Sequence, residues 1–291
     1  MTTTDGAFTR FDLSPLRGSK IPFGRLLLAM FQHATSQSLA SVTALIIGTG
    51  MVIRTLVGGT SGFLALLGAF VLVTGVVLAF TAVITARRQL RLAAFAERNG
   101  LDFTARADGV RYPGAAFEIR GDRHTHTGVV SGTARGGAFA IGNYKVTRRK
   151  RDSDGGHTTT TVTEFGYLVT SVALRLPRIL LDAKGNGTLA LNRHGLVKWD
   201  LEGDFPVAFT TMCVPGQERD MLEVLAPDVM QVFSDYLTDF DIEIIGSRLF
   251  LMRKDRHTAA PGEIAAYLAA ADRLVVELVE RLPFHRIGPT G

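Results

Sequence analysis

Two histidines stand two positions apart in GDRHTHTG, residues 121–128, the stretch whose residue types are most suited to chemistry. In a β-strand, His124 and His126 would point to the same side and could share a metal ion. A metal site also needs further ligands and groups that orient the imidazoles. Asp154 and His157 could supply ligands only if the strands bring the two segments together. The alternative is an exposed strand carrying two polar histidines, and we expect no bound metal or cofactor.

The strongest positive cluster is KVTRRKRDSD, residues 145–154, at the expected tip of a β-hairpin. Near a membrane surface, each cation of such a cluster contributes on the order of 1 kcal/mol of attraction to anionic lipid headgroups. An acidic partner is a similar ligand, whereas nucleic acid is disfavoured for a domain tied to a membrane. The alternative is a solvated tip whose charges block edge-to-edge strand pairing. The candidate contact residues are Arg148, Arg149, Lys150 and Arg151.

Other patterns associated with catalysis are missing from the sequence. The glycine-rich pieces at 58–62 and 131–137 do not match phosphate-binding loops, and no nucleophilic-serine or H-E-x-x-H signature is present. The single cysteine, Cys213, is expected to be a small buried hydrophobe. We therefore predict that the chain is not an enzyme. The acidic residues near the last third are expected to be solvated charges beside a turn: Asp235, Asp239, Asp241 and Glu243.

The elements that would position these groups begin in the membrane. Residues 63–86 are 24 residues without a charge. As a helix they would extend about 36 Å, more than the roughly 30 Å hydrocarbon core of a bilayer. Residues 36–56 are less apolar and carry Arg54 near their end, where an arginine can reach the headgroups. We predict a transmembrane helical hairpin over residues 36–86, preceded by a cytoplasmic segment over residues 1–35.

Small residues recur along both predicted spans. Helices in a bilayer associate by close packing over such residues, because lipid tails are as apolar as leucine. We therefore expect the two spans to pack along these rows. The rows are Ser41, Ala44 and Gly48 in the first span, and Gly68, Gly75, Ala79, Ala82 and Ala86 in the second.

Basic residues lie at the ends of the predicted hairpin rather than at its connecting turn. Arg87, Arg88 and Arg91 directly follow the second span, whereas only Arg54 lies near the connecting turn. Cytoplasmic flanks carry an excess of arginine and lysine, so both termini are expected in the cytoplasm, at the plasma membrane. The net charge of +5 suits a protein beside anionic headgroups. We expect the three arginines that follow the span to contact lipid or an acidic partner.

After the hairpin, residues 87–99 are expected to form a helical connector, and residues 100–291 a cytoplasmic α+β domain with a mainly antiparallel sheet. Asn99–Gly100 is a typical helix end. Helical periodicity is strong over 226–240 and 263–282. Predicted strands cover residues 117–121, 126–134, 138–149, 158–174, 178–183, 196–200 and 206–214, with a further hairpin over 241–255 turning at Gly246–Ser247.

Several segments resemble a group of uncharacterised two-span actinobacterial membrane proteins. They are FAERNGLDF at 95–103, GTARGGAFAIGNY at 132–144 and ERLPF at 280–284. The group commonly has an aromatic pair near Tyr144, where this chain has Gly142 and Asn143. The resemblance implies an integral membrane protein with a cytoplasmic α+β domain, and it implies no activity.

The sequence thus predicts a membrane-anchored interaction or regulatory module whose partners are the bilayer and an unidentified protein. Two alternatives remain open. The first is an accessory subunit of a larger membrane complex, with the small-residue faces docking on partner helices. The second is a metal-dependent enzyme that uses His124 and His126.

Overall fold

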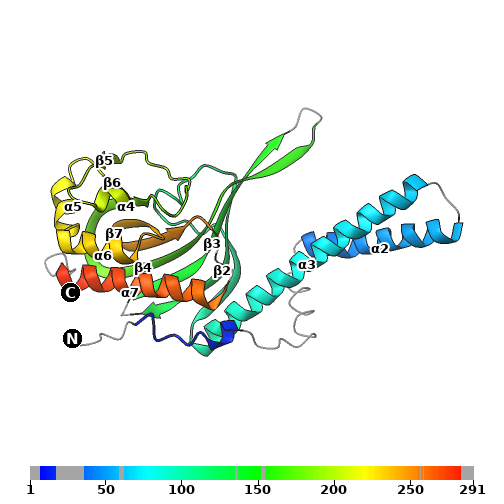
Figure 1. Cartoon of the computed structure of the whole chain (residues 1–291), viewed down its shortest axis with the longest axis horizontal. Coiled ribbons are helices and arrows are strands. Elements are labelled where there is room, and N and C mark those ends of the chain that lie inside the picture. The colour runs from blue at the N-terminus through cyan, green and yellow to red at the C-terminus, as the bar shows by residue number, and fades with distance from the viewer. Residues whose placement is uncertain are drawn as a thin grey trace. The chain divides into compact units, whose positions relative to one another are not determined.

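The computed structural model describes residues 7–17, 36–58, 62–134, 137–151, 155–255, 257 and 259–282 (Figure 1). The chain divides into two compact units. We call Gly18–Ala94 the helical unit, and Met1–Arg17 together with Phe95–Gly291 the α+β unit. Each unit is described by itself below.

The helical unit contains α2 (Ser36–Gly58) and most of α3 (Gly62–Arg98). By length and apolar composition, the stretch Leu66–Arg98 could cross a membrane. The apolar stretch described within α2, Ile46–Thr55, is shorter than a span. The predicted turn at 57–62 falls partly on residues 59–61, which lie outside the described residues, as do residues 18–35. The structure therefore has one long apolar helix, and a second span stays a prediction.

Two glycines of the predicted rows lie in close contact with the facing helix. A Cβ atom added to Gly48 would lie 2.7 Å from the backbone nitrogen of Leu72, and one added to Gly68 would lie 3.0 Å from the Cβ of Met51. Such distances leave no room for a side chain at Gly48. By contrast, Gly50, two positions along α2, has open space around it. The close packing that small residues allow between helices is thus present within the chain.

The α+β unit is built on one antiparallel sheet of seven strands. Its order is β1-β2-β3-β4-β6-β5, with β7 paired to the other edge of β4. The strands are β1 (Asp102–Asp108), β2 (Arg123–Ala134), β3 (Gly137–Arg151), β4 (His157–Ala183), β5 (Val197–Trp199), β6 (Phe209–Cys213) and β7 (Asp241–Arg253).

The longest strand, β4, organises this sheet. Its first part pairs with β3, its last part pairs with β6, and β7 follows its opposite edge from Gly166 to Leu181. The predicted strands 158–174 and 178–183 are therefore one strand. The predicted hairpin over 241–255 is wrong, because β7 continues through Gly246 with a positive φ of 59°. Residues 117–121 form no strand, and β1 was not predicted.

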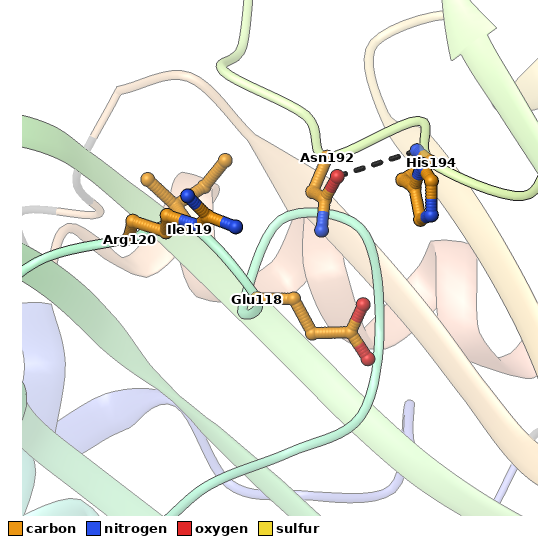
Figure 2. Close-up of a pocket in the computed structure, with 5 residues that line it drawn as sticks. All are labelled: Glu118, Ile119, Arg120, Asn192 and His194. Carbon is orange, nitrogen blue, oxygen red and sulfur yellow. Dashed lines mark hydrogen bonds between the residues drawn. The ribbon is translucent and has the colours of Figure 1, made fainter.

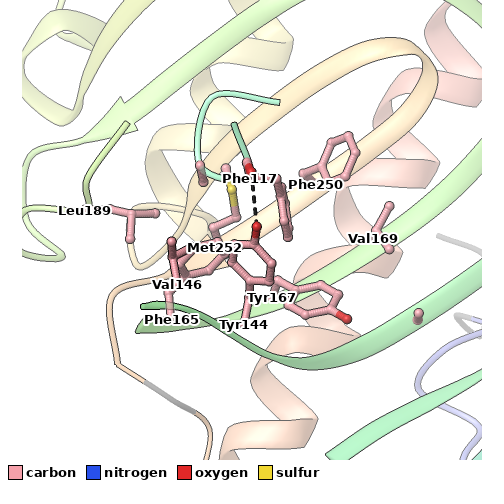
Figure 3. Close-up of a cluster of buried hydrophobic side chains, with 11 residues drawn as sticks. Phe117, Tyr144, Val146, Phe165, Tyr167, Val169, Leu189, Phe250 and Met252 are labelled. Carbon is pink, nitrogen blue, oxygen red and sulfur yellow. Dashed lines mark hydrogen bonds between the residues drawn. The ribbon is translucent and has the colours of Figure 1, made fainter. Parts of the chain in front are cut away.

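Helices and an irregular segment cover the two faces of the sheet. Alternation along β3 and β4 places Tyr144 and Tyr167 on one face, beneath Phe117 of the irregular segment 109–122 (Figure 3). On the other face, Tyr267 of α7 lies over Gly166, where an added Cβ would meet its hydroxyl at 2.6 Å. The helices are η1 (Ser14–Arg17), α4 (Phe205–Ala208), α5 (Glu218–Val224), α6 (Pro227–Tyr236) and α7 (Pro261–Arg281).

The N-terminal segment, residues 7–17, belongs to the core of the α+β unit. The Asp272 carboxylate of α7 accepts the backbone N–H groups of Phe8 at 3.1 Å and Thr9 at 2.8 Å. The Phe8 ring is fully buried and packs edge-on against Phe139, with ring centroids 5.3 Å apart. This segment is thus held by buried hydrogen bonds and aromatic packing.

A second set of contacts joins this segment to the end of α3. The Asn99 side chain accepts the backbone N–H of Asp12 at 2.7 Å and donates to its carbonyl at 3.1 Å. The Asp12 carboxylate also pairs with Arg98 at 3.0 Å. The chain that precedes the helical unit therefore contacts the chain that follows it, inside one compact unit.

We expect Gly48→Ala to weaken the pairing of α2 with α3 by about 1 to 3 kcal/mol, because the new methyl group collides with backbone. Gly50→Ala is the matched control and should have little effect, because its methyl group enters open space. The measurement is energy transfer between labels at Ile53 and Val73 of the full chain during titration with sodium dodecyl sulfate. Equal behaviour of the two variants would contradict the packing.

Candidate functional site

His124 and His126 both lie on β2, but they are buried rather than exposed. Their residues are 8% and 1% exposed, and both rings face the aromatic cluster under segment 109–122. The alternative interpretation as an exposed strand is therefore wrong. No local sequence pattern indicates this burial, because the covering segment comes from between β1 and β2 and has no regular structure.

Protein groups lie within hydrogen-bond distance of both nitrogens of each imidazole. His126 Nε2 lies 3.1 Å from the Val110 carbonyl and must donate to it, so its Nδ1 accepts from the Tyr167 hydroxyl at 2.8 Å. Burial lowers the pKa of His126, which favours this neutral form. His124 Nδ1 lies 2.6 Å from the Tyr144 hydroxyl, and its Nε2 lies 3.3 Å from the Gly121 carbonyl.

The tyrosine partners are as buried as the histidines. The Tyr144 hydroxyl donates its one proton to the Phe117 carbonyl at 3.1 Å, a bond drawn in Figure 3, so it accepts from His124 Nδ1. Burial raises the pKa of Tyr144 to about 12 and that of Tyr167 well above its usual range. Both phenols are therefore neutral donors. Predicting them as partners needed the register that places His126 opposite Tyr144 on β3.

This arrangement suits a structural role better than metal binding. A metal ion would have to displace a tyrosine hydroxyl or a backbone carbonyl from each ring, and the displaced groups would be buried without partners. In the described part of the chain, no group of three or more His, Cys, Asp or Glu side chains could hold a metal. His157 lies at the start of β4, opposite Arg151, and Asp154 is outside the described residues.

An open hollow adjoins the covering segment. It has a volume of about 440 Å³ and is lined by Glu118, Ile119, Arg120, Asn192 and His194. Figure 2 shows the Asn192 side chain accepting the His194 backbone N–H, at 3.3 Å. Glu118 is only loosely paired with Arg178, at 3.8 Å. Among these five lining residues no acid–base pair is hydrogen-bonded, so the hollow shows no arrangement for proton transfer.

Two carboxylates that we expected to be solvated are fully buried. Glu243 on β7 accepts the Ala115 backbone N–H at 2.6 Å and pairs with Arg178 at 3.0 Å. Asp241 accepts the Ala183 backbone N–H at 2.8 Å and the Asn186 side-chain amide at 3.1 Å. Burial raises the pKa of Glu243 and raises that of Asp241 to about 6. The prediction of solvated charge is wrong for both residues.

The basic cluster lies on a two-stranded ribbon, which we call the basic arm: residues 147–151 of β3 and 157–162 of β4 (Figure 1). A register shift at Val146/Thr147 marks its base. The four basic residues are exposed, and their partner strand is rich in threonine. Lys145, by contrast, lies inside the sheet and pairs with Glu164 at 3.8 Å.

The three arginines after the predicted span lie on α3. Arg87 is exposed, whereas Arg88 and Arg91 are half-buried. Their contact with lipid or an acidic partner stays a prediction. Cys213 is buried as predicted, and burial raises the pKa of its thiol.

Comparisons with known proteins assign no family. No model of a protein family matches the chain, and no curated protein matches it. Among solved structures, it is similar to the crystal structure of the mycobacterial trehalose monomycolate transport factor A, TtfA. The identity is 13% and the TM-score is 0.46, over 66% of this chain and 96% of that chain. At this level of similarity no function passes from that protein to this one.

The buried Asp241 should make stability fall as pH rises. Its folded-state pKa of about 6 lies above the ordinary value of 3.8, so the protonated form favours folding and that contribution is lost as pH rises through 6. Relative to Asp241→Asn, the wild type should lose about 3 kcal/mol of unfolding free energy between about pH 4 and pH 7.

Urea unfolding of the full chain in a non-ionic detergent, followed by Trp199 fluorescence, measures this difference. The control is Asp235→Asn, which removes a carboxylate on the exposed side of α6. A difference between wild type and Asp241→Asn that stays constant over this pH range would contradict the burial of an ionisable carboxylate.

Proposed function

We propose that this protein is a non-enzymatic interaction or regulatory module, held at the cytoplasmic face of the plasma membrane by a two-span anchor. The anchor comprises α2 and α3, and the module is the α+β unit. The resemblance to two-span actinobacterial membrane proteins agrees with this proposal.

The observation that carries the proposal is the closure of the α+β unit around the break in its sequence. Residues 7–17 and the residues from Phe95 onward form one compact unit, held by Asp272 and Asn99. A folded unit lies on one side of a membrane, so the segment 18–94 must leave and return on that side. Its number of crossings is therefore even. If α3 crosses once, a second crossing must come before it, and α2 is the helix available there.

Exposed apolar side chains on the helical unit support its placement in lipid. Phe63, Phe70 and Phe80 are 72%, 70% and 66% exposed on α3, and Ile46 is 68% exposed on α2. Water would make such a surface costly, and soluble monomers rarely expose contiguous apolar patches of this kind. In a bilayer the same side chains meet lipid tails.

The two alternative functions receive less support. An accessory subunit was expected to dock through its small-residue faces, but Gly48 and Gly68 are occupied by the pairing of α2 with α3. A metal-dependent enzyme would need free nitrogens on His124 and His126, and both rings are engaged.

Single-cysteine labelling tests the topology. We expect a membrane-impermeant maleimide to label Val57→Cys in intact cells, because Val57 ends α2 at the predicted outer turn. Arg10→Cys and Arg219→Cys should be labelled only after the membrane is disrupted, because both belong to the α+β unit. The native Cys213 gives little background, since its thiol is buried.

Three outcomes would overturn the proposal. Labelling of Arg10→Cys and Arg219→Cys on opposite sides would break the closure argument. Labelling of both in intact cells, with Val57→Cys protected, would reverse the orientation. Recovery of the full chain in the soluble fraction after cell lysis would remove the membrane anchor itself.

A further inference from the structure

We infer that the basic arm inserts between the headgroups of an anionic membrane leaflet and binds their phosphates. This inference rests on the proposed function, because that function brings the arm to a membrane. It names the ligand class, anionic phospholipid, and the part of the protein that contacts it.

The basic arm carries cations on both faces of its ribbon, which suits insertion among headgroups better than lying flat on a surface. Because side chains alternate along a strand, Arg149 and Arg151 lie on one face of the ribbon, and Arg148 and Lys150 lie on the other. A ribbon resting flat on a surface would use only one of these faces. A ribbon standing edge-on among headgroups would use both. Five residues of β3 past the register shift extend about 17 Å, enough to pass through a headgroup layer.

The cations of the arm are exposed, and the Arg148 guanidinium also donates to the Arg120 carbonyl at 3.1 Å. Opposite Arg148, Arg149 and Lys150 stand only threonines, residues 158–160 of β4. One carboxylate, that of Asp122, approaches the base of the arm. It accepts the backbone N–H of Arg149 at 2.6 Å. Asp152 and Asp154 at the tip lie outside the described residues. By sequence, their two negative charges do not cancel the four positive charges of residues 148–151. Threonine hydroxyls can also donate hydrogen bonds to phosphate oxygens.

In the described part of the chain, no strand pairs with either edge of the arm beyond its base at Thr147. Strand β2 begins at Arg123, opposite Thr147 of β3, and β7 pairs with β4 only from Gly166 onward. Two open edges without charges would invite pairing with another chain, so charge here also protects the fold. Protection alone does not require four consecutive cations on both faces of the ribbon.

Covalent attachment favours lipid over a nucleic acid as the ligand. The predicted span ends at residue 86 and the α+β unit begins at Phe95, so only a short stretch of chain links the unit to the membrane. A membrane surface is then permanently present at a high effective concentration, whereas a nucleic acid must be captured from solution.

The test places an environment-sensitive fluorophore on Thr159→Cys, opposite Arg149, in the full chain reconstituted in nanodiscs. We expect a blue shift in discs that contain phosphatidylglycerol, no shift in pure phosphatidylcholine, and reversal by about 1 M salt, where screening acts within about 3 Å. Arg149→Gln combined with Arg151→Gln should lower the ratio of bound to free arm roughly fivefold per cation removed.

Arg175→Gln combined with Arg219→Gln is the matched control, because it removes two exposed cations outside the arm. Equal effects of the two double variants would overturn the inference. So would a label that stays silent in anionic discs, or one that responds to a single-stranded oligonucleotide but not to the discs. A silent label in a chain that still inserts into discs removes the arm's role and leaves the proposed function standing. Failure to insert contradicts the proposed function instead.

Discussion

The Asp272 carboxylate holds the start of the chain in the α+β unit by accepting two successive backbone N–H groups, those of Phe8 and Thr9. Bonds from backbone donors to a charged acceptor are among the stronger ones in proteins. Asn99 repeats the arrangement at Asp12, next to the end of α3. The helical unit, residues 18–94, is therefore a loop of about 80 residues whose two ends join the same folded unit. Any account of the apolar helices has to respect that closure.

The closure of the α+β unit strengthens the prediction that α2 crosses the membrane. Taken alone, α2 is a weak candidate for a span, because the apolar stretch described within it is short. The closure supplies an independent argument, since one crossing cannot return the chain to the side it left. The packing at Gly48 agrees with a paired rather than a single helix. Charge counting around the pair then addresses orientation, which neither packing nor closure can decide.

The sequence predicted elements whose signals are local. Helices α6 and α7 begin at Pro227 and Pro261 and follow a clear apolar period. Strands β4 and β7 were divided by mistake because Pro177 and Gly246 usually end strands. In the fold, Pro177 lies within a register shift of β4, and Gly246 takes a left-handed conformation opposite Leu176. The register shift of β4 and the left-handed glycine of β7 thus face each other across the two strands. No local sequence pattern indicates that these distant residues are paired.

The candidate sites divide in the same way. The basic arm could be predicted, because consecutive cations beside a turn are typically exposed to solvent. The burial of His124 and His126 could not, because it depends on the irregular segment that carries Phe117 over them. Nor could the burial of Glu243, whose compensating partners, Arg178 and the Ala115 backbone, come from far along the chain. Buried polar residues were read as solvated because their partners are brought together only by the sheet.

The closure of the α+β unit is the central claim, and crosslinking in native membranes tests it most directly. Asp12→Cys combined with Arg98→Cys replaces an exposed ion pair 3.0 Å apart, and exposed pairs of this kind contribute little to stability. A short bifunctional maleimide should join this pair efficiently within one chain. It should not join Asp12→Cys to Arg219→Cys, a residue of α5 that no described contact links to the N-terminal segment. Absence of the first crosslink in membranes, or equal yields from both pairs, would contradict the account.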